Sequence, residues 1–213
     1  EEFKNDTWDA IQRGISLNPI LHSFQMTVNQ YQIDLKLIDA FFHSMEMDLS
    51  KKEYNKTEYG EYIYGSAEVV GLMCLKVFCE GKEDICQQLT ASAKSLGAAF
   101  QKVNFLRDLK ADKEGLSRLY FPGCDFDNFT ETDKRQIEED IQNDFKAAFE
   151  GVKQLPLKAR FGVYVAYKYY FSLFKKIKRL QPAHILAQRI HIPNYYKALI
   201  ILRAGVKNQL RLL

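Results

Sequence analysis

The sequence predicts an all-α protein, and three observations lead to that fold class. Apolar residues recur every three to four positions along almost the whole chain, which is the period of amphipathic helices. Residues that favour helix starts and helix ends bracket most of these segments. No segment shows the apolar–polar alternation of a half-buried strand. We therefore expect about eight helices in a single domain that spans residues 1–213.

The first half of the chain is expected to form four helical segments. They cover residues 3–14, 19–31, 34–54 and 57–78. Asn18 and Asp34 are suitable N-caps for the second and third segments, and Pro19 fits a first helical position. The fourth segment contains small residues that would let another helix or a ligand approach closely, namely Gly65, Ser66, Ala67 and Gly71.

The second half is expected to form four more helical segments. They cover residues 84–113, 130–153, 156–181 and 182–212. Gly115 and the Pro122–Gly123 pair mark a loop between the first two. Either Thr130 or Thr132 opens the charged segment that follows this loop.

Composition limits the classes of partner and the compartment. The formal net charge is only +3, with 30 basic and 27 acidic residues, which argues against nucleic acid as a partner. The four cysteines form no CxxC pair, so reduced thiols and a cytoplasmic location are expected. No apolar run reaches the length of a membrane span. Since the sequence begins at Glu1 rather than Met, we expect that an N-terminal segment is missing from it.

The segment "QKVNFLRDLKAD" places polar side chains on one side of its helix. At 100° per residue, Asn104, Asp108 and Asp112 lie at about 300°, 340° and 20° relative to Gln101. The four residues form one polar stripe, and Val103, Leu106 and Leu109 lie opposite it.

Two aspartates four residues apart repel each other when both are ionised, and a divalent cation would reverse that effect. Mg²⁺ prefers oxygen ligands and often takes only one or two carboxylates, with water and phosphate completing its shell. Arg107 could pair with a diphosphate. The alternative is a solvated acidic face whose charges are neutralised by Lys102, Lys110 and Lys113.

The string NxxRDxxxD, followed by "GLSRLYFP", resembles the second aspartate-rich motif of the phytoene/squalene synthase family. Three further stretches resemble family segments in the same order: "FFHSMEMDL", "YIYGSAEVVGL" and "SLGAAFQKVNFLRD". The resemblance covers nearly the whole chain and is greatest to bacterial phytoene synthases.

This resemblance implies an isoprenoid synthase type helical bundle around a deep apolar cavity. It implies head-to-head condensation of two prenyl diphosphates, most simply two geranylgeranyl diphosphates to phytoene through a cyclopropylcarbinyl diphosphate, as in carotenoid biosynthesis. Mg²⁺, with Mn²⁺ as a substitute, is the implied cofactor, and no NADPH is expected. Squalene or dehydrosqualene synthesis, and a non-catalytic relative acting as a binding or assembly factor, remain alternatives.

The resemblance also assigns roles to individual residues. Tyr62, Asp108 and Asp112 would act in catalysis, and the two aspartates with Asn104 would hold the metal. The substrate-binding set would be Asp48, Gln101, Asn104, Arg107, Arg118, Tyr120 and Arg189. For Asp48 a structural ion pair is an equal alternative, and Arg107, which lies off the stripe, could anchor its helix instead.

Two departures from the family pattern stand out. The first aspartate-rich motif is absent from this sequence, so half of the family's metal site is expected to be missing, and the chain as given is expected to be incomplete and inactive. Glu68 stands where the family usually has Gly, and it either faces the site or pairs with a base such as Lys52. The basic segment "FKKIKRL" could touch anionic lipid, although a solvated helix end is the simpler interpretation. The sequence does not predict an oligomeric state.

Overall fold

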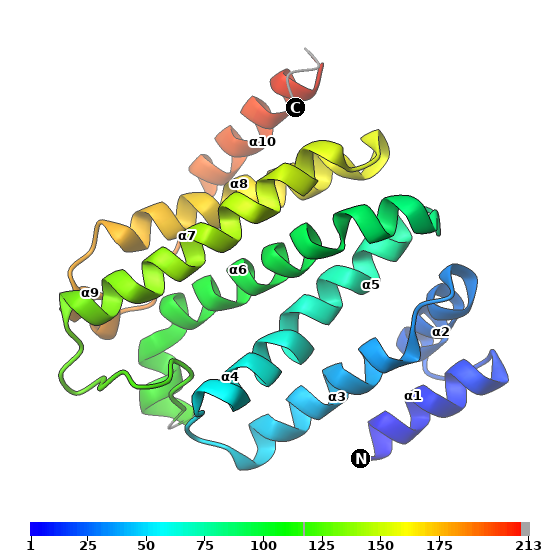
Figure 1. Cartoon of the computed structure of the whole chain (residues 1–213), viewed down its shortest axis with the longest axis horizontal. Helices are drawn as coiled ribbons and strands as arrows, with labels where there is room; N and C mark the ends of the chain where they lie inside the picture. Colours follow the sequence, from blue (N-terminus) through cyan, green and yellow to red (C-terminus); the bar gives the residue numbers. More distant parts are fainter. Residues whose placement is uncertain (117, 210–213) are drawn as a thin grey trace.

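A computed structural model of the chain describes residues 1–116 and 118–209. Within that part it contains ten α-helices, one π-helix and no strand, which confirms the all-α class (Figure 1). The elements are α1 (Glu2–Arg13), α2 (Pro19–Tyr31), α3 (Leu35–Ser50), α4 (Lys56–Ile63), the π-helix η1 (Tyr64–Glu68), α5 (Val69–Phe78), α6 (Glu83–Leu116), α7 (Glu131–Gln154), α8 (Leu157–Lys178), α9 (Pro182–Ala187) and α10 (Asn194–Gln209). That the chain forms a single domain stays a prediction.

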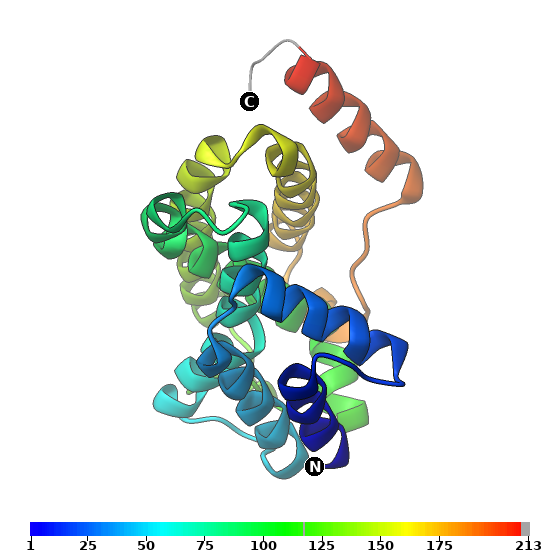
Figure 2. The same ribbon diagram turned by 90° about the vertical axis from the view of Figure 1, so that its right-hand side faces the viewer.

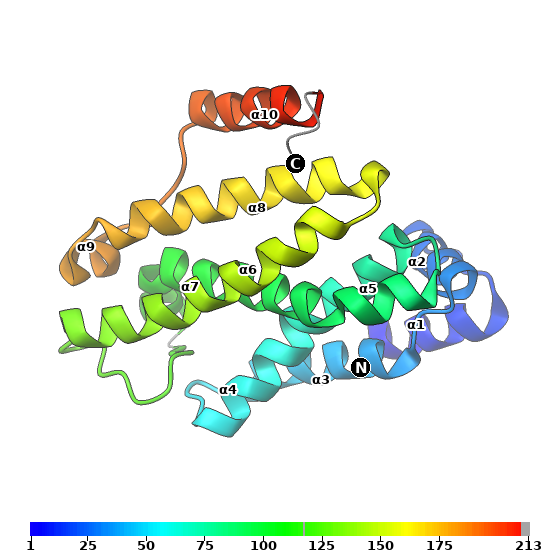
Figure 3. The ribbon, with the colours of Figure 1, turned by 45° about the horizontal axis from the view of Figure 1, so that its top comes forward.

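The long helix α6 lies at the centre of the bundle. It packs against α7 and α8 on one side and against η1 and α5 on the other. Helix α3 covers η1 and α5, and α1 pairs with α2 beyond them. Figure 3 shows the resulting succession of helices from α10 through α8, α7 and α6 to α3, and Figure 2 shows α1 and α10 at opposite ends of the molecule.

Three predicted helix starts have the expected caps. Asn18 Oδ1 accepts a hydrogen bond from the Ile20 amide at 3.0 Å, and Asp34 Oδ1 accepts one from the Lys36 amide at 3.0 Å. Thr130, rather than Thr132, caps α7, and it forms a reciprocal capping box with Asp133. Each cap satisfies backbone donors that the first helical turn leaves without a partner.

The small residues on α5 and α6 bring these two helices into close contact. A Cβ atom added to Gly71 would lie 2.6 Å from the carbonyl oxygen of Ala93, and one added to Gly97 would lie 2.4 Å from that of Ala67. A larger residue at either position would push the two backbones apart. The predicted close approach is therefore confirmed, and it fixes the wall of the site described below.

Three predicted segments differ from the structure. The segment 34–54 was expected to be helical to its end, but α3 stops at Ser50 and Tyr54 lies in the loop that follows. The segment 57–78 is interrupted by the π-helix η1, which inserts one wider turn after Ile63. The stretch 182–212 was expected to be one helix, but α9 and α10 are separated by an extended segment. Pro193 disfavours helical backbone in the residue before it, and the burial of Ile190 and Ile192 holds the extended segment against the bundle.

Candidate active site

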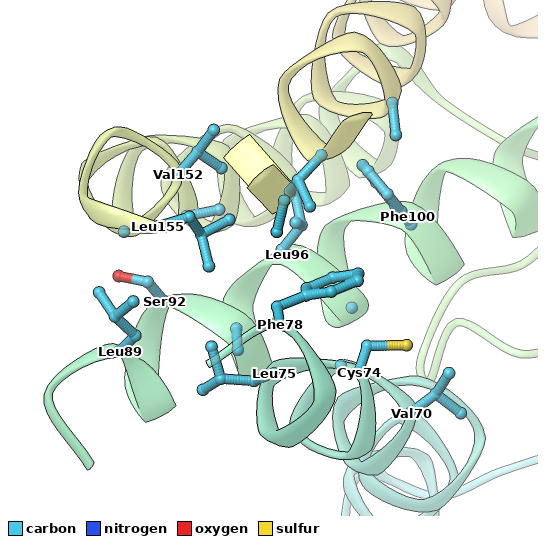
Figure 4. Close-up of a pocket in the computed structure, with 18 of the residues that line it drawn as sticks. Val70, Cys74, Leu75, Phe78, Leu89, Ser92, Leu96, Phe100, Val152 and Leu155 are labelled. Carbon is cyan, nitrogen blue, oxygen red and sulfur yellow. The ribbon is translucent and has the colours of Figure 1, made fainter. Parts of the chain in front are cut away.

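An apolar cavity of about 570 Å³ lies between α5, α6, α7 and α8. Figure 4 shows side chains from these elements around it, among them Phe78, Leu96, Phe100, Val152 and Leu155. The lining is almost wholly apolar, and its polar members include Gln101. An apolar cavity, as expected for this fold, is therefore present between these helices.

Helix α6 carries both the cavity wall and the predicted polar stripe. Its cavity-lining residues run from Leu89 to Gln101, a length of about 18 Å along the helix axis. The stripe starts at Gln101 and continues to Asp112 over a further distance of about 17 Å. Gln101 therefore marks the point where the apolar cavity meets the acidic end of the same helix.

Asp108 is held by two arginines. The Arg107 guanidinium donates to both carboxylate oxygens, with Nε at 3.0 and 3.1 Å, and the hydrogen bond raises the pKa of Arg107. Arg189, from the extended segment after α9, places its Nε 2.7 Å from Asp108 Oδ1. Two of the predicted diphosphate-binding arginines therefore converge on one predicted metal-binding carboxylate.

Asp112, one turn further along α6, has a different environment. No side chain among the described residues donates a hydrogen bond to its carboxylate or forms an ion pair with it. Partial burial raises the pKa of Asp112 to about 6, and the neighbouring charge of Asp108 adds to this shift. Asn104 Oδ1 is also buried without a hydrogen-bond partner. Oxygen acceptors on the stripe therefore lack the partners that a purely structural role would supply.

The oxygen atoms of these side chains are ligands of the kind that Mg²⁺ prefers. Within residues 1–116 and 118–209, no group of three or more His, Cys, Asp or Glu side chains is placed to hold a metal ion. The available donors are the carboxylates of Asp108 and Asp112 and the amide oxygen of Asn104. Mg²⁺ often takes only one or two protein carboxylates together with substrate phosphate and water. The donor set present in this chain therefore suits a Mg²⁺–diphosphate site better than a metal site built from protein ligands alone.

A second carboxylate, Asp48 at the end of α3, is surrounded by tyrosine hydroxyls. Tyr54 donates to Oδ1 at 3.1 Å, Tyr62 donates to Oδ2 at 2.9 Å, and Tyr120 approaches Oδ1 at 3.4 Å. Arg118 donates to the Asp48 backbone carbonyl at 2.6 Å, and its guanidinium lies 3.7 Å from Oδ1. Asp48 is thus the centre of a hydrogen-bonded tyrosine cluster rather than a member of a simple ion pair.

An isolated bridge between Glu53 and Leu119 assembles this tyrosine cluster. The bridge joins the loop after α3 to the loop after α6, with the Leu119 amide 2.8 Å from the Lys52 carbonyl. As a result the rings of Tyr54 and Tyr120 stack at 5.4 Å. Tyr54 was not predicted as a site residue, because nothing in the local pattern shows that its loop returns to Asp48.

The tyrosine cluster adjoins the stripe on α6. The charges of Asp48 and Arg118 both act on the pKa of Asp112, and the Arg118 amide donates to the Asp112 carbonyl at 2.9 Å. Burial raises the pKa of Tyr62, so its hydroxyl stays protonated and acts as a donor. The structure therefore brings Asp48, Tyr62, Tyr120 and Arg118 together beside Asp112.

The lysines near the stripe do not neutralise it. Lys102 contacts Asp140 and Asp144 on α7, at 2.5 and 2.7 Å. Lys110 and Lys113 make their ion pairs with Glu114 and Asp127, respectively. The prediction that these three lysines balance Asp108 and Asp112 is wrong, because each is drawn to another carboxylate.

Glu68 also makes a different contact from the one that was predicted. It pairs with Lys94 on the facing helix α6 at 3.0 Å, and not with Lys52. This pair ties η1 to α6 next to Gly97, where the two backbones are closest. The acidic residue at this position is therefore accommodated by a partner on the neighbouring helix.

The geometry defines a class of protein: an all-α bundle in which one helix, α6, carries both the wall of an apolar cavity and, beyond it, a stripe of carboxylates that arginines and a tyrosine cluster adjoin. The sequence model of the family described as squalene/phytoene synthase matches residues 2–196. This chain belongs to that family, which comprises head-to-head prenyl diphosphate condensing enzymes of the prenyltransferase type, and whose members are typically metal-dependent.

Solved structures show the same fold at low sequence identity. A dehydrosqualene synthase determined in complex with ligand superposes with a TM-score of 0.79 and 16% identity, over 98% of this chain and 77% of the other. The squalene synthase HpnC from Alicyclobacillus acidocaldarius gives a TM-score of 0.71 and 15% identity, over 84% of this chain and 72% of the other. No curated protein sequence matches this chain. Among the described residues, no helix is long and apolar enough to cross a membrane.

Proposed function

We propose that this protein condenses two prenyl diphosphates head to head, and that its substrates are two geranylgeranyl diphosphates, joined through a cyclopropylcarbinyl diphosphate to give phytoene for carotenoid biosynthesis. The observation that carries the proposal is the group of oxygen acceptors without partners, on Asn104 and Asp112, beside the polar end of an apolar cavity. The apolar lining of the cavity suits the long hydrocarbon chain of a prenyl group, and the oxygen acceptors without partners suit a metal-bound diphosphate.

The first chemical step is departure of diphosphate from an allylic carbon, which requires stabilisation of several negative charges. Asp108, Asp112 and Asn104 would hold Mg²⁺, which supplies Lewis-acid stabilisation of the leaving diphosphate when bound. Arg107 and Arg189 already lie at Asp108, so they can donate to diphosphate oxygens with short side-chain movements. We assign both arginines to the diphosphate site.

The allylic cation must be kept away from water, and the cavity walls serve that purpose. The lining exposes almost no polar atoms between α5 and α8. Phe100 lines the cavity and stacks on Tyr170 with ring centroids 4.0 Å apart. An aromatic face at this position stabilises a passing carbocation. Tyr62 donates a hydrogen bond at the polar end and helps to keep Asp48 and its loop in place.

The proposal is tested by product formation. The full-length protein is incubated with geranylgeranyl diphosphate and Mg²⁺, and the hydrocarbons are extracted and analysed. Phytoene is expected, and Asp108→Asn should lower turnover about 10²–10³-fold because a metal ligand is lost. The absence of hydrocarbon from this and every shorter prenyl diphosphate would refute the proposal and favour a non-catalytic binding or assembly factor.

The preference for the length of the prenyl substrate is tested by substitution of Gly162 on α8. This glycine lines the cavity, and a Cβ atom added to it meets no atom within 4 Å, so a larger side chain fits without strain. Gly162→Leu should lower kcat/KM for the C20 substrate relative to the C15 substrate by about tenfold, whereas Gly162→Ala should not. A wild-type preference for farnesyl diphosphate would instead assign squalene or dehydrosqualene synthesis.

Three further features belong to the same proposal. Phytoene formation ends in proton loss and not in reduction, so no NADPH requirement is expected. A cytoplasmic location is proposed from the cysteines, all four of which are free thiols. Peripheral membrane contact is proposed at the basic C-terminal part of the chain, since the substrates and product are lipids.

A further inference from the structure

The helical segment that carries Tyr62 contains one π-turn, and this turn sets the direction in which Tyr62 points. Helices α4 and α5 lie in line beside α6, with η1 between them (Figure 1). In an uninterrupted α-helix, Tyr62 and Gly71 would face opposite sides, about 180° apart. The wider turn takes up one extra residue, or about 100°, so the angle between the two residues falls to about 80°.

The contacts of Tyr62 and Gly71 agree with the smaller angle. The Tyr62 ring lies 5.9 Å from the ring of Phe105 on α6, and its hydroxyl donates to Asp48 at 2.9 Å. Gly71 also faces α6, where an added Cβ atom would lie 2.6 Å from the carbonyl oxygen of Ala93. With ordinary helical spacing only one of the two residues could face α6. A return of η1 to α-helical geometry would therefore rotate Tyr62 away from Asp48 by about 100°.

Lys94 on the neighbouring helix α6 contacts both ends of this π-turn. Its ammonium group lies 3.0 Å from the carboxylate of Glu68, the last residue of η1. It also lies 5.2 Å from the ring centroid of Tyr64, the first residue of η1, which is a cation–π distance. The same cation therefore joins the two ends of the turn and ties both of them to α6.

The surroundings of Glu68 favour this contact. Its side chain is only 21% exposed, and Gly97, on the turn of α6 that follows Lys94, brings the α6 backbone against Ala67 and Glu68. Glu68 stands where the resembling family usually has Gly, and a glycine could not form the ion pair. Since π-turns are rare and are found frequently at functional sites, a side chain that holds one in place next to Tyr62 indicates a role in the site.

We propose that Lys94 and Glu68 are positioning residues for Tyr62, because they hold η1 in its π-helical form and thereby keep the Tyr62 hydroxyl directed at Asp48. An ion pair that only stabilised the fold would leave Tyr62 in the same place when it is removed, and this difference can be measured. The consequence for turnover rests on the proposed function, whereas the effect on the position of Tyr62 does not.

Fluorine NMR of the full-length protein labelled with 3-fluorotyrosine reports on the surroundings of Tyr62 without any substrate. The Tyr62→Phe variant assigns the Tyr62 signal by its loss. We expect Lys94→Met to shift or split this signal, and Lys94→Arg, which keeps the positive charge, to leave it in place. Lys76→Met is the matched control, because Lys76 also joins α5 to α6, through Glu83 at the other end of α5, and undergoes the same change.

Turnover kinetics separate positioning from stability. Lys94→Met should lower kcat about tenfold and change KM by less than about twofold, since a displaced group is missed in the transition state and not in substrate binding. In the Tyr62→Phe background the same substitution should lower kcat no further, because the residue that the clamp positions has already lost its hydroxyl. Glu68→Gln should have the same effects on the signal and on kcat, and it serves as the test if Lys94→Met does not fold.

An unchanged Tyr62 signal in Lys94→Met and Glu68→Gln would overturn the proposal, and so would an equal shift in the control Lys76→Met. A further tenfold loss of kcat in the Tyr62→Phe background would also contradict it, because the ion pair would then act through another residue. If no prenyl diphosphate gives a hydrocarbon, the proposed function fails, and the NMR comparison still decides whether Lys94 and Glu68 position Tyr62.

Discussion

Asp48 and Asp112 are both partly buried and lie close enough to interact, but their hydrogen bonding differs completely. Asp48 receives hydrogen bonds from tyrosine hydroxyls on three different segments, and Arg118 holds its backbone carbonyl. Asp112 receives none from the described side chains, and its pKa is raised to about 6. Both carboxylates lose hydration on folding, and only Asp48 gains protein partners in return.

The difference separates a carboxylate whose partners support the structure from one whose oxygens are open to a ligand. Hydrogen bonds to a charged group stabilise the fold, so the partners of Asp48 fix the loops that carry Tyr54 and Tyr120. A buried acceptor without a partner lowers stability, and it persists where function requires it. Asp112 and Asn104 fit that description, and the two kinds of carboxylate can be separated by mutation.

The largest expected effect is on turnover at Asp112. Asp112→Asn should lower product formation from geranylgeranyl diphosphate about 10²–10³-fold, since a metal ligand is removed. The free energy of unfolding should not fall, because the amide avoids the cost of burying a charge. Glu114→Gln, on the same helix and exposed, is the matched control. Undiminished turnover, or a loss of stability parallel to the loss of activity, would contradict the proposed role.

The opposite result is expected at Asp48. Asp48→Ala removes the shared acceptor of three hydroxyls, so the free energy of unfolding should fall by about 3 kcal/mol in urea titrations. Asp39→Ala, an exposed position on the same helix, should change it by less than about 0.5 kcal/mol. Equal stabilities for these two variants would show that the tyrosine cluster contributes little to the fold.

A smaller effect is expected when one hydroxyl is removed from the cluster. Tyr62→Phe breaks the 2.9 Å hydrogen bond to Asp48 Oδ2 and should lower the free energy of unfolding by about 1–2 kcal/mol. In the Asp48→Ala background the same change should have almost no effect, because the acceptor is already absent. Additive losses in this double-mutant cycle would mean that the Tyr62 hydroxyl stabilises the fold through a partner other than Asp48.

The sequence predicts those parts of this structure that depend on local periodicity. Helical spacing places Gln101, Asn104, Asp108 and Asp112 on one stripe, and local chemistry predicts Asn18 and Asp34 as caps. The close approach of α5 and α6 follows from small residues that are visible in the sequence.

Most of the contacts that were not predicted join distant segments. Arg189 reaches Asp108, and Tyr54 reaches Tyr120, only after the bundle has formed. A helical wheel shows that a lysine such as Lys102 is near an aspartate on its own helix. It does not show that α7 brings Asp144 closer. The π-helix after Tyr62 is likewise set by packing, since its residues follow the ordinary helical period.

The smallest expected effect is the pH dependence that Asp112 adds to stability. Its pKa is about 6 in the folded chain and about 3.9 in an unfolded one, so between these values the folded state holds a proton that the unfolded state has lost. The contribution of Asp112 therefore becomes unfavourable as pH rises through this window, by about 1–2 kcal/mol after allowance for solvent screening. Urea unfolding in the presence of EDTA at pH 4.5 and pH 7 measures this contribution. The quantity compared is the free energy of unfolding of the wild-type protein and of Asp112→Asn. The variant should gain stability relative to the chain at pH 7 but much less at pH 4.5, whereas a pH-independent difference would mean that Asp112 is already well compensated. Mg²⁺ should reduce the difference at pH 7, because the ionised carboxylate then has its missing partner.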